Sequence, residues 1–214
     1  MALAIEYLSP SLGFWTPGLG RSTTADWDVE GGHMAERCAL FIIIALGEGI
    51  VVTGRTFAGQ AMTGDNVAAF LVAFAGSVLM WWIYFDLGAR RGAELIAHHA
   101  EPGRVARNAY TYLHMPIVAG IIVGAVADEL LLAHPEGLAP RALVAFQCSG
   151  LALFLLGVGF FKRLANPYGT FPLSHLAGLC LLAPVALWAG LGQVPALAFA
   201  ALTVLVLIIV AAWE

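Results

Sequence analysis

The sequence predicts an all-α fold, a polytopic transmembrane helical bundle that crosses the bilayer about six times. Of 214 residues, 60% are hydrophobic and 11% are charged, and the mean hydropathy is +0.85. Soluble globular domains are about 45–50% apolar and about 25% charged. Six apolar stretches are each about 20 residues long, the length that a helix needs to cross a bilayer core of about 30 Å. This composition excludes an ordinary soluble domain, which could not bury so much apolar surface.

The apolar stretches also set the domain organisation. Residues 1–32 are predicted to be an N-terminal stub and polar loop, because the first apolar run is too short to span a bilayer. Residues 33–214 are predicted to form the transmembrane helical domain. Its expected spans are 33–58, 66–88, 107–132, 142–161, 172–191 and 196–213.

Turn-forming and basic residues justify the ends of these spans in order. The pair GG precedes the first span, the turn-like TGDN precedes the second, and HP follows the third. The pair KR closes the fourth span, ahead of NP. Pro172 suits the first turn of the fifth helix. Only GQVP separates the fifth span from the sixth, so these two are expected to form a tight hairpin.

Basic residues in the loops predict the orientation. With six spans, most of them fall on one side of the membrane: Arg21, Arg90, Arg91, Arg104, Arg107, Lys162 and Arg163. Arg55 and Arg141 fall on the opposite side. Because cytoplasmic loops are enriched in Lys and Arg, both termini are predicted to be cytoplasmic.

Ionisable side chains inside the spans are the candidate functional residues, because each costs free energy in a bilayer unless it is paired or hydrated. The first span holds most of them. At about 100° per residue, Arg37, Glu48 and Arg55 fall on one stripe of this helix, and His33 lies one turn before Arg37. Such a polar face is expected to look at other helices or at water, not at lipid.

Depth along the helices predicts which of these side chains could meet. A cluster near the cytoplasmic end is geometrically allowed for five residues: His33, Glu36, Arg37, Asp86 and His114. Glu48 lies deeper, and the flanking glycines Gly47 and Gly49 would let a neighbouring backbone approach closely. We treat these six residues as a candidate ion or proton pathway or buried polar network.

Structural interpretations of the same residues stay open. Glu36 and Arg37 could be interfacial, reaching the headgroups or pairing with Asp86 to fix the fold. Glu48 could form a structural hydrogen bond or be neutral, and His114 could bond to backbone carbonyls freed by Pro116. The GxxxG pattern of Gly120 and Gly124 in the third span favours helix packing.

Several functional classes find no support in the sequence. There is no GxSxG, HExxH or P-loop motif, so no enzyme and no cofactor are predicted. The pair His33 and Glu36 lacks the full ligand count of a metal site, and the cysteine spacing fits neither zinc nor a disulfide framework. A net charge of −4 without a basic patch gives no reason to expect nucleic acid as a partner.

Three segments resemble the bacterial low-temperature-requirement protein A family. The run WDVEGGHMAERCALFIIIALGE is similar to its signature of H-x-x-E-R followed by an apolar run ending in L-G-E, and WWIYFD and YTYLHMPIVAGIIVGAVADE are similar to its following segments. The family's signature positions fall on His33, Glu36, Arg37, Gly47, Glu48, Tyr84, Phe85, Asp86, Tyr112 and His114. The resemblance implies a multi-pass protein of the bacterial inner membrane with a role in growth at low temperature.

This chain departs from that family in length. Members are usually nearly twice as long and begin with helices carrying an E-x-x-F-D-L-x-F-type motif, which is absent here. The resemblance places this chain on the C-terminal half of such a protein. If the polar stripe of the first span faces the other half, another chain is expected to cover it, as a homo-oligomer or through a different membrane protein.

Two functional hypotheses follow, with the lipid bilayer as a partner in both. In the first, the protein is a transporter or an ion- or proton-conducting protein that uses carboxylates buried in the membrane, since pumps relay protons through such groups. In the second, it is a non-catalytic accessory or structural subunit that packs against other membrane proteins in a larger complex.

Overall fold

The computed structural model describes residues 2–22, 31–86, 102–166 and 168–214, and it confirms the all-α fold. Six helices are long and apolar enough to cross a membrane. Apart from two isolated bridges, the described residues form no strand. The helices are α1 (Ala2–Ser11), α2 (Gly31–Ala58), α3 (Gly64–Phe85), α5 (Pro102–Ala106), the π-helix η2 (Arg107–Tyr112), α6 (His114–Ala133), α7 (Arg141–Ala165), α8 (Leu173–Leu191) and α9 (Ala196–Trp213).

The observed spans differ from the expected ones mainly in the third. It runs from Gly103 to Ala133, because α5 and η2 continue the helix on the N-terminal side of α6. The fourth span, α7, extends to Ala165, past the pair Lys162 and Arg163 that was expected to close it. The second span ends at Phe85, and its expected end at residue 88 lies outside the described residues. The fifth and sixth spans form the expected hairpin, with α8 ending at Leu191 and α9 beginning at Ala196.

Helices α6 and α7 make the closest contact in the bundle. A Cβ atom on Gly120 would lie 2.6 Å from the backbone nitrogen of Phe154 and 2.7 Å from the carbonyl oxygen of Gly150. A Cβ on Gly150 would in turn lie 2.8 Å from the nitrogen of Gly124. The GxxxG pattern on α6 therefore packs against α7, as small residues do where two membrane helices approach closely.

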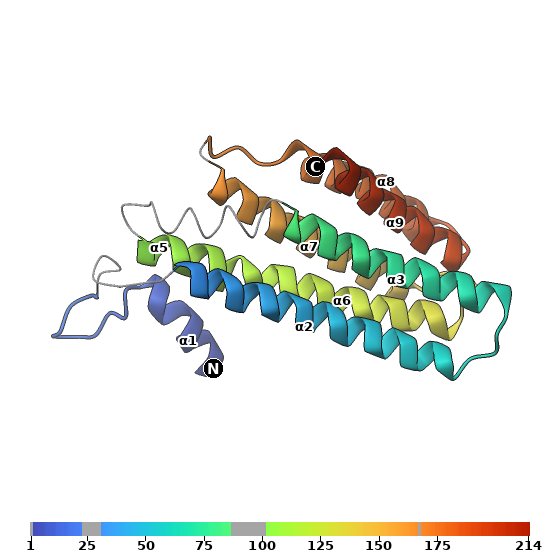
Figure 1. Ribbon diagram of the computed structural model, residues 1–214, viewed down its shortest axis with the longest axis horizontal. Coiled ribbons are helices and arrows are strands. Elements are labelled where there is room, and N and C mark those ends of the chain that lie inside the picture. The colour runs from blue at the N-terminus through green and yellow to red at the C-terminus, as the bar shows by residue number, and fades with distance from the viewer. Residues whose placement is uncertain (1, 23–30, 87–101, 167) are drawn as a thin grey trace.

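The remaining spans are arranged around this pair. In Figure 1, α1 and α2 lie along one side of the bundle, and α8 and α9 lie on the opposite side. In the most apolar 18-residue stretch of α7, 56% of the stretch is buried inside the bundle, whereas in that of α2 only 22% is buried. At one end, the α6–α7 and α8–α9 loops are joined by two backbone hydrogen bonds, Ala139 N to Val194 O at 2.8 Å and Ala196 N to Gly137 O at 2.9 Å.

The α6–α7 contact can be tested with Gly120→Ala. The added methyl group would meet backbone atoms, which cannot rotate away, so we expect a loss of about 1–3 kcal/mol and a lower Tm in detergent micelles. Gly190→Ala is the matched control, because a Cβ there meets nothing within 4 Å. Equal Tm values for the two variants would contradict this packing.

Candidate functional site

The polar stripe of α2 lies on the outside of the described bundle. The core-facing side of this helix carries Ala35, Ile42 and Leu46, which are 9%, 0% and 4% exposed. Glu48 and Arg37 are exposed on the other side. Within the described part of the chain, no side chain or backbone group forms a hydrogen bond or ion pair with Glu48.

Arg55 is also exposed on this side of α2, near the far end of the helix. Apolar side chains share the surface with the charged ones, since Leu40, Ile44 and Val51 are 52%, 65% and 63% exposed. We call Arg37, Leu40, Ile44, Glu48, Val51 and Arg55 the outer face of α2.

The depth of Glu48 makes this exposure important. It lies in the middle third of the span Gly32–Ala58, so its carboxylate is level with the hydrocarbon core. Gly47 points about 100° away from it around the helix and lines an apolar pocket together with Leu46 and Phe74. The described helices do not supply the covered environment that the sequence predicts for this residue.

The five residues of the expected cluster have different environments. His33, Glu36, Arg37 and Asp86 are exposed, whereas His114 is 4% exposed. His114 therefore lies inside the bundle and the four others lie on its surface. A role for these residues in transport stays a prediction.

His114 is held by two hydrogen bonds directly after the π-helix. Its Nδ1 lies 2.8 Å from the carbonyl oxygen of Ala109, and its Nε2 lies 2.8 Å from the hydroxyl of Tyr84. A carbonyl can only accept, so Nδ1 donates to Ala109, and in the neutral imidazole Nε2 then accepts from the Tyr84 hydroxyl. Ala109 lies seven residues before Pro116, so its carbonyl is not the one that the proline frees, and the interpretation that His114 bonds to such a carbonyl stays a prediction.

Aromatic rings enclose His114 on two sides. The Tyr110 ring stacks on the imidazole, with centroids 5.2 Å apart and an interplanar angle of 21°. Phe161 meets it edge-on at 5.1 Å. The Tyr110 hydroxyl is buried and has no hydrogen-bond partner among the described residues. The site is therefore a packed aromatic core with one polar pair, Tyr84 and His114.

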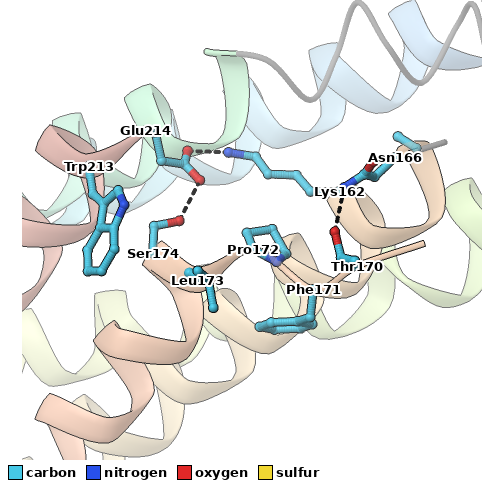
Figure 2. A pocket seen from close by; sticks show the side chains of 10 residues that line it. Lys162, Asn166, Thr170, Phe171, Pro172, Leu173, Ser174, Trp213 and Glu214 are labelled. Atoms are coloured by element: carbon cyan, nitrogen blue, oxygen red, sulfur yellow. Dashed lines mark hydrogen bonds and ion pairs between the residues drawn. The ribbon is translucent and has the colours of Figure 1, made fainter. Parts of the chain in front are cut away.

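A second polar cluster lies where α7, α8 and α9 end or begin together (Figure 2). Lys162 on α7 and Glu214 after α9 form an ion pair, and their side chains are 10% and 5% exposed. The other carboxylate oxygen of Glu214 lies 3.2 Å from Ser174 Oγ and 3.1 Å from His175 Nδ1 on α8. His175 is fully buried, and within the described part of the chain its Nε2 has no hydrogen-bond partner.

Sequence reasoning missed this cluster. In the sequence, Lys162 indicates only the orientation and the end of the fourth span, and the residues that meet it are far away in the chain. A weak signal existed, because the polar pair Ser174 and His175 lies in the first turn of an otherwise apolar helix. Among the described residues, no group of three or more His, Cys, Asp or Glu side chains could hold a metal ion.

The Glu214 carboxylate has a perturbed pKa. Burial by itself would raise the pKa of this group, but the hydrogen bond from His175 and the nearby Lys162 ammonium outweigh it and lower the pKa below the usual value. A lowered pKa means that the folded state favours the ionised carboxylate, so this group adds stability at neutral pH.

The Tyr84–His114 bond predicts the effect of Tyr84→Phe. The variant leaves Nε2 of a buried imidazole without a partner, which costs about 1–3 kcal/mol, so the Tm in micelles should fall. Tyr168→Phe is the control, because Tyr168 is 87% exposed. An unchanged Tm for Tyr84→Phe would show that this hydrogen bond does not stabilise the bundle.

The lowered pKa of Glu214 predicts a pH dependence of stability. The stabilisation by the ionised Glu214 carboxylate should be complete above the ordinary glutamate pKa of about 4.3. It should be lost as the pH falls through the lower pKa that Glu214 has in the folded state. Thermal unfolding of the wild type and of Glu214→Gln should therefore converge on acidification. Glu136→Gln, in an exposed loop, should keep the wild-type pH profile, and a constant gap between wild type and Glu214→Gln would contradict the expectation.

The comparisons with known proteins identify the family. Residues 1–212 match the family model described as Bacterial low temperature requirement A protein (LtrA). The chain is 38% identical over 214 residues to an uncharacterized protein, RA0937, of Rhizobium meliloti (strain 1021). The match covers all of this chain and 51% of that relative. It thus spans about half the length of the relative it matches. No solved structure matches. The chain is a multi-pass membrane protein and belongs to the bacterial low temperature requirement A protein family.

Proposed function

We propose that this chain is part of an ion- or proton-translocating protein of the bacterial inner membrane, and that the outer face of α2 borders the translocation path. The observation that carries the proposal is Glu48, an exposed carboxylate in the middle third of a membrane span. Holding a charged side chain at the centre of a bilayer costs about 2.5–3.5 kcal/mol on insertion scales. A water-filled path beside α2 removes that cost.

The spacing of the charges supports a path rather than an internal ion pair. Arg37 and Glu48 are separated by about 16 Å of helix rise, and Glu48 and Arg55 by about 10 Å. Neither arginine can bond to Glu48 directly over these distances, so each charge needs water, an ion or another protein group.

A second candidate function is an accessory or structural subunit. The specific observation behind it is that exposed apolar side chains alternate with the charges on the outer face, as at an interface between membrane proteins. The relative contains about as much chain again outside the matched region, which could cover this face there. Under this proposal the protein has no transport activity of its own, and a homo-oligomer or a different membrane protein covers α2.

The orientation remains part of the proposal. With the basic loops in the cytoplasm, both termini are cytoplasmic. The beginnings of α2 and α8 and the end of α7 then lie near that membrane surface.

Ion flux through Glu48→Gln tests the transport proposal. In proteoliposomes carrying a pH-sensitive dye, wild-type protein should dissipate an imposed pH gradient or membrane potential, and Glu48→Gln should abolish that flux while its Tm stays unchanged. Glu129→Gln is the matched control, because Glu129 is also exposed in a span but lies near its end. Wild-type vesicles without flux, or full flux in Glu48→Gln, would overturn the proposal.

The accessory role predicts a different result for the wild-type protein in proteoliposomes. Wild-type vesicles would show no flux, and the protein extracted in mild detergent would elute with a partner in fixed stoichiometry. A monodisperse lone monomer would count against it.

A further inference from the structure

The second polar cluster borders a cavity that neither functional proposal uses. The cavity has a volume of about 550 Å³ and lies at one end of the bundle, between the last turn of α7, the first turn of α8 and the end of α9. Small-molecule sites have volumes of about 300–1,000 Å³. In Figure 2, Lys162, Glu214 and Ser174 lie on one side of the space and the ring of Trp213 lies near them.

Hydrogen bonds within the protein hold the side chains of the polar wall of the cavity. The Lys162–Glu214 ion pair is almost completely buried, and Ser174 and His175 hold the second carboxylate oxygen. Thr170 Oγ1 accepts a hydrogen bond from the Asn166 amide at 2.9 Å, so its hydroxyl hydrogen can still be donated. A ligand would therefore meet the Lys162 ammonium, the side-chain carboxylate of Glu214 and a hydroxyl donor.

The outer edge of the cavity is apolar. Leu173 and Trp213, which line it, are 66% and 58% exposed. Leu176, one turn further along α8, is 49% exposed. Both cavity residues lie at a helix end, the level of the lipid headgroups, where tryptophan is enriched in membrane proteins. These side chains offer a surface on which an acyl chain can lie.

We propose that this cavity binds the headgroup of a zwitterionic phospholipid that carries a primary ammonium, an ethanolamine phospholipid. A neutral pair of fixed charges gives little net attraction to an ion of one sign, but a zwitterion can satisfy both members. The ammonium donates to Glu214, the phosphate accepts from Lys162 and Thr170, and the acyl chains lie against Leu173 and Trp213. A choline headgroup lacks the N–H donors that the carboxylate requires.

Native mass spectrometry of the purified, delipidated chain tests the proposal. With equal amounts of phosphatidylethanolamine and phosphatidylglycerol of identical acyl chains, the ethanolamine lipid should be retained in preference. Lys162→Met and Glu214→Gln should each weaken its binding about tenfold, the loss expected for one hydrogen bond to a charged group. Arg141→Met, an exposed charge at the opposite end of α7, should bind as the wild type does.

Two results would overturn the proposal. One is phosphatidylglycerol or phosphatidylcholine bound as well as phosphatidylethanolamine, and the other is unchanged preference in both cavity variants. The wild-type preference needs no variant, so it decides the question even if Glu214→Gln fails to fold by circular dichroism. Soluble phosphoethanolamine should compete only weakly, and competition as strong as that of the lipid would overturn the assignment to a membrane lipid.

Discussion

The backbones of α6 and α7 touch where Gly120 meets Gly150 and Phe154, and the positions of the other helices depend on that contact. Lipid tails are as apolar as leucine, so membrane helices gain little from hiding apolar surface from lipid and associate through close packing. A glycine at the crossing point allows the largest number of backbone contacts there. Phe154 and Ile117, both fully buried, extend the contact on either helix, and α2, α3 and α8 then pack around the pair.

The sequence was sufficient for the spans but not for all of their ends. Hydropathy locates helices of this kind because the backbone must satisfy its own hydrogen bonds in lipid, and the six predicted spans are present. The third span was predicted to start four residues late, because Arg104 and Arg107 interrupt its apolar pattern. In the structure Arg107 instead donates to the Pro10 carbonyl at 2.5 Å, a contact across the chain that local composition cannot show.

Only the part of the candidate site that lies on a single helix could be predicted from the sequence. The stripe of Arg37, Glu48 and Arg55 follows from helical periodicity alone, and the structure places it on one side of α2. The described helices leave that side exposed, which the periodicity of one helix cannot show. The Lys162–Glu214 pair could not be foreseen for a similar reason, since it joins the end of α7 to the end of α9.

The π-helix in the third span has a consequence for how this protein and its relatives are compared. Hydrogen bonds of the i→i+5 type hold more residues per turn than an α-helix does, so side chains before residue 107 and after residue 112 do not share one 3.6-residue phase. A single helical wheel drawn over Gly103–Ala133 at about 100° per residue would place Val105 about 120° away from Ile117, although both side chains are buried. The span has to be treated as two segments with a phase slip between them. His114, the first residue of α6, lies after this slip, so a wheel that begins at Gly103 cannot give the direction of its side chain.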